Sequence, residues 1–456
     1  MKTKSRIAIL SYSFALLLAA GLLSTCRPDL KKPLLSEGDA NFSKFISLGG
    51  DFMAGYQDGA LYKDGQQYSF PYLMAKNIHL AGGPAQFAQP FISDNLGLGI
   101  NLKPWESEYV TASKLRFKTG CNGVSSLFPI KNNFNISSAA IYLQHQSDIF
   151  QNIGVPFAKI SDYNKPSLGI AGNANPYYTR FASSPGISTM LSDAKAQNPT
   201  FFILWAGMED VYDYVMHGLY GSTTILSSSA FSISLDSVLS QLNTKGAIAN
   251  IPDFNSFPFY TTVPWNGLDL PKNKVDSLNL LYFGPPPYAG LDTFHLGKNG
   301  FMIEDSKATN PPAGYRKTTN RDYILLSVPI DSLKCNFLGA FSPMPDQYVL
   351  DTAEVKIVNK IISEYNTVIA AKAHQYNLAL VDMNTYFESV VKGIKWDGAD
   401  FNAAFVSGGF FSLDGYHPNQ KGYALIANEF IRAINSKYNS TIPWVNCPEC
   451  SGVEFP

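Results

Sequence analysis

Short runs of apolar residues alternate along this chain with segments of helical periodicity, and this alternation limits the possible folds more than any other feature. Residues 201–205 are all apolar and are followed closely by Gly207, as expected for a strand that is covered on both faces. Apolar residues at helical spacing follow between Phe231 and Leu242, and a second strand is predicted at 247–251. This order is typical of α/β domains built on a mainly parallel sheet.

The same alternation continues towards both ends of the chain. Residues 45–48 are predicted to form a strand that enters a glycine turn. Asp351, with Glu354 three residues later, predicts a helix start. A strand at 378–382 and a helix over 423–434 follow. We therefore expect one α/β domain with a mainly parallel sheet.

One part of the chain does not follow this pattern. Between about residues 260 and 350 the periodicity fails, and prolines at 285–287 and 311–312 interrupt the segment. We interpret it as an irregular insertion near the rim of the sheet. With 456 residues the chain is long enough for two or three domains, or for one large domain with insertions. The pattern favours a single domain over 43–437, followed by a C-terminal tail at 438–456.

The first residues predict export. Lys2, Lys4 and Arg6 precede an apolar stretch at 7–23, which is the arrangement of a secretory signal peptide. A transmembrane anchor is the alternative, but about 17 apolar residues are few for crossing a bilayer. We therefore expect a signal peptide at 1–25, and no transmembrane run is evident in the sequence after it.

The end of this stretch, Leu23-Ser24-Thr25-Cys26, resembles the lipoprotein box of bacteria. The resemblance implies that Cys26 becomes the mature N-terminus and carries a lipid, with residues 26–42 as a tether. Thr25 departs from the box, because a smaller residue is usual there. The expected location is therefore bacterial and membrane-anchored, at the outer membrane, with the face of that membrane left open.

Composition excludes several classes of protein and partner. Hydrophobic residues make up 45% of the chain and charged residues 16%, so a folded core is expected rather than disorder. The net charge is −1, with 35 Lys and Arg against 36 Asp and Glu. This balance lacks the basic excess that binding to nucleic acid requires. These features leave the oligomeric state open.

Four cysteines follow Cys26 in the sequence. An exported chain carries its cysteines into an oxidising compartment, where disulfides form. The CPEC pair of Cys447 and Cys450 has no second pair to complete a zinc site, so we expect a local disulfide or free thiols there. How the four residues are paired is left open: Cys121, Cys335, Cys447 and Cys450.

Four segments place glycines and polar residues where a sheet of this kind binds its ligand. In an open α/β sheet, ligands bind beyond the carboxyl ends of the strands. The segments 49–56, 152–157, 207–210 and 414–418 (GGDFMAGY, NIGVPF, GMED and DGYHP) occur in an order that resembles the SGNH or GDSL hydrolases. The similarity spans about residues 43–437. It implies a three-layer α/β/α sandwich of SGNH/flavodoxin-like type with a mainly parallel sheet. It also implies the hydrolysis of acyl or acetyl esters, including esters on glycans.

The family implied by this resemblance cleaves esters with a serine in the first segment. A histidine removes the serine proton, and an aspartate three residues before it orients the imidazole ring. The oxyanion is held by the serine N–H, a glycine N–H of the second segment and an asparagine amide of the third. Asp414 and His417 match the aspartate and histidine of that set.

The other family positions are substituted. Counting back from Gly55, Asp51 stands where the family has its serine, whereas the alternative alignment would put Phe52 there. Phe157 stands at the glycine position and Glu209 at the asparagine position. The oxyanion-hole positions are therefore expected to hold two acidic residues and one aromatic residue.

These substitutions argue against a serine mechanism. A carboxylate at Asp51 is already ionised near neutral pH, so it is expected to pair with a His417 imidazolium. Glu209 is expected to present negative charge to a developing oxyanion, which reverses the usual stabilisation. The ring of Phe157 is expected to fill space that an acyl oxygen needs.

Three interpretations of the candidate catalytic set, Asp51, Glu209, Asp414 and His417, stay open. The first is an inactive catalytic centre in a protein that binds a glycan or peptide or acts as a scaffold. The second is a metal-assisted hydrolase that uses Asp51, Glu209 and His417 as ligands. The third is a carboxylate nucleophile at Asp51. The first is favoured, and no cofactor is expected.

Overall fold

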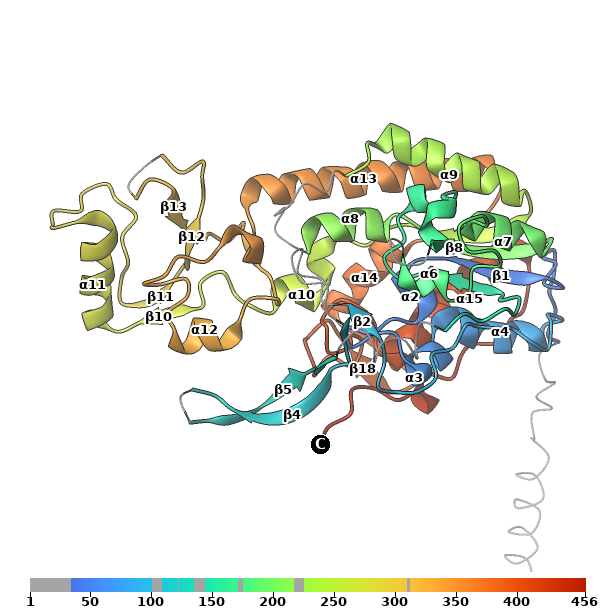
Figure 1. Ribbon diagram of the computed structural model, residues 1–456, viewed down its shortest axis with the longest axis horizontal. Helices are drawn as coiled ribbons and strands as arrows, with labels where there is room; N and C mark the ends of the chain where they lie inside the picture. The colour runs from blue at the N-terminus through green and yellow to red at the C-terminus, as the bar shows by residue number, and fades with distance from the viewer. Residues whose placement is uncertain are drawn as a thin grey trace, which may run out of the picture. The chain divides into compact units, whose positions relative to one another are not determined.

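A sheet of five parallel strands forms the centre of the fold (Figure 1). The computed structural model describes residues 34–100, 109–121, 123–134, 144–170, 175–216, 225–309 and 312–456. The strand order in the sheet is β16, β9, β8, β1 and β7. The bounds of these strands are β1 (Phe45–Gly49), β7 (Asn152–Gly154), β8 (Phe201–Trp205), β9 (Lys245–Ala249) and β16 (Ala379–Val381).

Two layers of helices cover the faces of this sheet (Figure 1). One layer holds α7 (Met190–Ala196), α9 (Ser228–Leu242) and α13 (Thr352–Gln375). The other layer holds α4 (Phe70–Leu80) and α15 (Gln420–Tyr438). Every residue of β1 and β8 is buried, because helices cover both faces of these strands. The predicted α/β/α sandwich with a parallel sheet is confirmed.

The predicted helix start at Asp351 is present. The Asp351 side chain accepts hydrogen bonds from the N–H groups of Ala353 and Glu354, and the Glu354 side chain accepts one from the Asp351 N–H. This reciprocal capping satisfies N–H groups that a helix end leaves without partners. The helix that begins here, α13, runs beside α9 and forms one outer layer of the sandwich.

Two predicted strands are shorter or displaced. The structure ends β9 at Ala249, whereas the sequence pattern placed a strand at 247–251. The N–H of Ile251 donates to Oδ1 of Asn366 at 2.8 Å, so the chain leaves the ladder before that residue. The strand predicted at 378–382 is reduced in the same way to the three residues of β16.

The strand order reverses at β1. The first strand of the chain lies between β7 and β8, which are the second and third strands of the sheet along the chain. At such a reversal the connections on either side diverge and leave a crevice at the carboxyl edge of the sheet. The turns that follow β1, β7 and β8 therefore meet, and they carry Asp51, Phe157 and Glu209.

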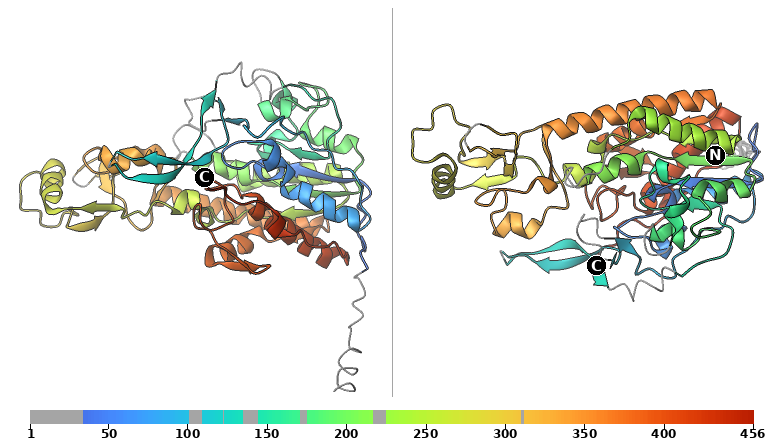
Figure 2. Two further views of the ribbon diagram at one scale, coloured as in Figure 1. Left: turned by 90° about the horizontal axis from the view of Figure 1, so that it is seen from below. Right: turned by 45° about the horizontal axis from the view of Figure 1, so that its top comes forward.

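Two insertions extend from this sandwich (Figures 1 and 2). The first, which the sequence did not reveal, includes the hairpin of β4 (Lys114–Thr119) and β5 (Ser125–Ile130). The second occupies the segment predicted to be irregular at 260–350. It contains α11 (Lys272–Phe283), several short strand pairs and two small apolar clusters of its own.

The remaining elements are short. Around the sandwich they are α2 (Asp51–Ala54), α3 (Lys63–Gln67), α6 (Pro176–Thr179), α8 (Met208–Val215), α14 (Met383–Lys392), β17 (Ile394–Trp396) and β18 (Ala399–Phe401). In the insertions they are β2 (Gly99–Ile100), β3 (Tyr109–Val110), β6 (Asn133–Phe134), α10 (Pro258–Thr261), β10 (Leu268–Leu270), β11 (Gly297–Asn299), β12 (Met302–Glu304), β13 (Tyr315–Lys317), β14 (Tyr323–Ile324), α12 (Ile330–Cys335) and β15 (Val349–Leu350).

The structure decides the cysteine pairing that the sequence left open. A disulfide joins Cys121 in the hairpin turn to Cys335 at the end of α12, with 6.2 Å between their Cα atoms. It links the two insertions to each other. Cys447 and Cys450 are free thiols, and both are buried. The segment after α15 is packed against the fold, since Ile442 is also buried.

The N-terminal predictions lie outside the described residues. This applies to the signal peptide at 1–25, to the lipid site at Cys26 and to much of the tether at 26–42. Within the part of the chain that the structure does describe, we find no helix with the length and apolar character needed to cross a bilayer.

Candidate functional site

Asp51 occupies the turn at the carboxyl end of β1. It is the first residue of α2, and only 1% of its surface is exposed. Its N–H donates to Oε1 of Glu209 at 2.9 Å. A glycine at position 50 permits this contact, because a Cβ atom there would lie 1.6 Å from the same Glu209 oxygen. The first and third predicted segments are thus joined through an acidic side chain.

Phe157 adopts a backbone conformation that favours glycine. Its φ angle is +64°, in the left-handed region where a bulky residue is strained. In this conformation its N–H donates to Oδ1 of Asp51 at 2.6 Å. Its ring packs against those of Tyr56 and Tyr177 at centroid distances of 5.4 and 5.9 Å. The alignment of Phe157 with the glycine is therefore consistent with its backbone geometry.

His417 lies between two carboxyl groups. Its Nε2 is 3.2 Å from Oδ2 of Asp51, and its Nδ1 is 2.9 Å from Oδ2 of Asp414. The same Asp414 oxygen accepts the Gly59 N–H at 2.9 Å. The structure therefore brings together the predicted acid, the predicted base and the residue at the serine position. Both ring nitrogens face carboxylates, so neither is bonded to a hydroxyl group.

The surroundings of His417 favour its charged form. Burial would lower the pKa of the imidazole, but the charge and hydrogen bond of Asp414, together with those of Asp51, raise it to about 9. Burial likewise opposes ionisation of Asp414, yet the charge and hydrogen bond of His417 leave the pKa of Asp414 below its ordinary value. At neutral pH the site therefore holds an imidazolium between carboxylates.

Glu209 differs from the prediction that it would present negative charge. Burial, and then the charge of Asp51, raise the pKa of Glu209 well above its ordinary value. Both effects oppose a negative charge on Glu209. Its Oε2 atom is buried and has no hydrogen-bond partner among the described residues.

The metal site considered for Asp51, Glu209 and His417 has no support from the geometry. Across the described ranges, no group of three or more His, Cys, Asp or Glu side chains is arranged to hold a metal ion. Glu209 points its Oε1 at the Asp51 N–H, whereas Asp51 points Oδ2 at His417. These oxygens are used within the protein rather than directed towards one common point.

Neither Ser47 nor Ser412 takes the place of a nucleophile beside His417. Ser47, within β1, donates to Oδ1 of Asn152 at 2.8 Å, and Ser412 accepts the N–H of Asp58 at 2.9 Å. Phe52, the residue of the alternative alignment, packs against Trp205 with ring centroids 4.9 Å apart. Phe52 therefore belongs to the core and not to the reacting part of the site.

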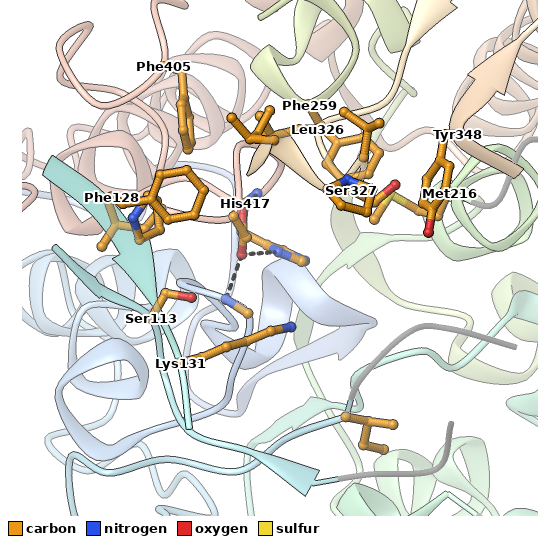
Figure 3. Close-up of a pocket in the computed structure, with 18 of the residues that line it drawn as sticks. Ser113, Phe128, Lys131, Met216, Phe259, Leu326, Ser327, Tyr348, Phe405 and His417 are labelled. Carbon is orange, nitrogen blue, oxygen red and sulfur yellow. Dashed lines mark hydrogen bonds and ion pairs between the residues drawn. The ribbon is translucent and has the colours of Figure 1, made fainter. Parts of the chain in front are cut away.

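A cavity of about 550 Å³ opens above His417. Figure 3 shows the imidazole with Phe128 and Phe405 on one side and Phe259 and Leu326 on the other. Most of these side chains come from the two insertions and not from the sandwich. Sequence reasoning missed them, because no periodicity in the insertions indicated which residues turn towards the site.

Asp58 joins the loop after α2 to the loop that carries Asp414. Its Oδ1 accepts the Leu413 N–H at 2.9 Å, and its Oδ2 accepts the Tyr62 hydroxyl at 2.6 Å. Its own N–H donates to Ser412. A left-handed φ of +56° agrees with a turn role for this residue. The structure adds that this turn holds the loop of the predicted acid.

Comparisons with known proteins point to one family. A family model described as GDSL-like lipase/acylhydrolase matches residues 132–430, a range that includes Phe157, Glu209, Asp414 and His417 and begins after Asp51. Among solved structures, the crystal structure of a candidate GDSL-like lipase from Parabacteroides merdae is similar at 13% identity, covering 89% of this chain and 99% of that chain with a TM-score of 0.32. No curated protein matches the chain.

Proposed function

Since this chain belongs to the GDSL-like lipase/acylhydrolase family, we propose that it is an exported, lipid-anchored member that binds an acyl-bearing ligand and does not cleave esters through a serine. One observation carries the proposal. Both backbone donors of the oxyanion site are already bonded to carboxyl groups, the Asp51 N–H to Glu209 and the Phe157 N–H to Asp51. A substrate oxyanion would have to displace these partners before it could be stabilised.

The charge state of the site supports the same proposal. A general base must accept a proton from the nucleophile at working pH. His417 already carries that proton near neutral pH, because its pKa is raised to about 9. Asp51 has no hydroxyl proton to give. The arrangement is therefore a satisfied ion pair in the place where the family carries out acyl transfer.

The cavity supports an acyl group as the ligand rather than a glycan. Its walls above His417 are largely aromatic and aliphatic, as with Phe259, Leu326 and Phe405. Apolar walls of this kind favour burial of a hydrocarbon chain, whereas a sugar needs several hydrogen-bonding groups. The alternative function is the binding of a glycan or a peptide, or a scaffold role. A comparison of fatty-acid binding with oligosaccharide binding distinguishes the acyl ligand from the glycan.

The experiment on catalysis uses a serine-directed fluorophosphonate probe and a panel of acyl and acetyl esters. We expect neither labelling nor turnover by the parent chain. The triple variant D51S/F157G/E209N restores the family's residues, and we expect it to be labelled if the rest of the cleft is competent. Adding H417A to the triple variant is the matched control and is expected to remove that labelling. Labelling or ester turnover by the parent chain would contradict the proposal.

The experiment on binding compares a fluorescent long-chain fatty acid with a neutral oligosaccharide. We expect the fatty acid to bind and L326W to weaken it at least tenfold by filling the cavity. The matched control is L296W, at an exposed position elsewhere on the chain, which is expected to leave binding unchanged. Binding of the oligosaccharide alone would support the alternative function instead.

The lipid anchor rests on the sequence of the first 26 residues. In a bacterial host fed an alkyne-tagged fatty acid, we expect the full chain to incorporate the tag and to fractionate with membranes. C26S is expected to lose the tag. Export of the chain without incorporation of the tag would contradict the lipid anchor. It would not affect the proposal that the cavity binds an acyl group.

A further inference from the structure

We propose that the β4–β5 hairpin is a docking surface for an anionic lipid bilayer, separate from any lipid carried at Cys26. The proposal goes beyond the function proposed above and does not depend on what the cavity binds. The segment that contains the hairpin is positively charged. Residues 109–134 contain Lys114, Arg116, Lys118 and Lys131 and no Asp or Glu, although the whole chain has a net charge of −1.

Not all of this positive charge is equally available. Lys118 forms an ion pair with Asp331 at 2.6 Å, so part of its charge is neutralised within the protein. Lys114 and Arg116 are exposed on the hairpin, and the charge of the proposed surface rests on these two. Each cation near a negatively charged membrane strengthens binding about fivefold.

The hairpin also exposes apolar side chains next to these cations. Phe117 is 68% exposed and Val124, at the turn, is 60% exposed. The register pairs Phe117 with Leu127 across the two strands. Side chains alternate between the faces of a strand, so this pair lies on the face opposite to Lys114, Arg116 and Lys118, and a bilayer that takes up the hairpin edge-on would meet both faces. Aromatic residues flanked by cations are typical of protein segments at a membrane interface.

The two faces of the hairpin thus carry different side chains. Lys118 and Phe128 line the cavity, with the Lys118 ammonium 5.2 Å from the centre of the Phe128 ring. Phe117 and Leu127 lie on the other face. In Figure 1 the hairpin projects from the sandwich beside the second insertion. Docking through the hairpin would bring one wall of the cavity to the lipid.

The hairpin is held in place before any partner binds. The disulfide between Cys121 and Cys335 and the Lys118–Asp331 ion pair both connect it to α12. A surface that is already ordered loses less conformational entropy on binding than a free loop does. An anionic polysaccharide would also attract the cations but would gain nothing from Phe117, and for this reason we favour the bilayer.

The test uses residues 35–456, which form one compact unit that holds the hydrophobic core and exclude Cys26. Cosedimentation is measured with vesicles of phosphatidylcholine and with vesicles that contain three parts in ten phosphatidylglycerol. We expect binding to the anionic vesicles only. K114Q/R116Q is expected to weaken it by about 25-fold, at about fivefold per cation. F117S is expected to weaken it about tenfold, and high salt is expected to reduce binding by the parent chain.

Two matched controls separate the hairpin from general surface chemistry. K272Q/K392Q removes two exposed lysines on other helices, and I187S removes an apolar side chain that is 79% exposed elsewhere. Both are expected to bind vesicles like the parent chain. Heparin is the probe for an anionic polysaccharide, and F117S is expected to leave any heparin binding unchanged. Vesicle binding that the hairpin variants retain, or binding to heparin without binding to vesicles, would overturn the proposal.

Discussion

The Nε2 atom of His417 lies 3.2 Å from Oδ2 of Asp51, the residue that aligns in the sequence with the serine of the family that the chain resembles. The imidazole is therefore bound by carboxylates at both of its nitrogens, since Asp414 contacts the other one. A serine at position 51 would give up a proton to this ring, whereas an aspartate stabilises the protonated ring. In this chain the arrangement stabilises an ion pair.

The first prediction concerns stability and pH. The pKa of His417 is about 9 in the fold against an ordinary 6.5. A raised folded pKa contributes stability that is complete below about pH 6.5 and is lost as the pH rises through about 9. The contribution is about 3 kcal/mol. The free energy of unfolding, measured by urea denaturation, should decline less between pH 6 and pH 9.5 for H417Q than for the parent. The free energy of unfolding of H374Q, a variant at an exposed site on α13, should decline as much as that of the parent.

The second prediction ranks the two carboxylates. Asp414 raises the pKa of His417 more than Asp51 does, and burial lowers it once a charge is removed. NMR titration of the histidine resonances should therefore give a lower pKa for His417 in D414N than in D51N, with both below the parent value of about 9. A larger decrease in D51N would mean that the pair with Asp51 is the dominant one.

The third prediction concerns Glu209. A carboxyl group with a raised folded pKa supports the fold while it is protonated. That support is complete below its ordinary pKa of about 4.3 and is lost as the pH rises through the folded pKa. E209Q stays neutral and keeps an acceptor for the Asp51 N–H, so its stability relative to the parent should increase between pH 5 and pH 8. E209A leaves that N–H without its partner and should be about 1–3 kcal/mol less stable than E209Q. Equal urea midpoints for E209Q and E209A would contradict this account.

The fourth prediction concerns the loop that holds Asp414. Asp58 accepts hydrogen bonds from Leu413 and Tyr62 and has a left-handed backbone. D58A should lose about 2 kcal/mol of stability or more, since it loses both acceptors and alanine is strained at that φ. It should also lower the pKa of His417, because Asp414 is less firmly placed. D58N tolerates the backbone and keeps one acceptor, so it should retain most of both properties. Thermal unfolding and histidine titration test this pair of variants. An unchanged pKa of His417 in D58A would limit Asp58 to a structural role.

The layers of the sandwich were predictable because local periodicity specifies them. The strand over 201–205 and the capped start of α13 at Asp351 follow from apolar runs and from a capping pair a few residues apart. The insertions were less predictable. The hairpin of β4 and β5 was not foreseen, and the segment at 260–350 contains short strand pairs. Such short elements depend on distant partners, so they leave little periodic signal in the sequence.

The sequence by itself determined the sheet, the order of the four motifs and the identity of the residues in them, because each depends on neighbours within one strand, turn or helix. Only the tertiary structure decided what those residues do to one another. The Asp51 N–H meets a carboxyl group 158 residues away, and the Phe157 N–H meets one 106 residues away. Burial and the charge of Asp51 raise the pKa of Glu209, whereas the charges and hydrogen bonds of Asp414 and Asp51 raise the pKa of His417 against the effect of its burial. Proton affinity and hydrogen-bond partners depend on atoms brought together across the fold, so no local pattern encodes them.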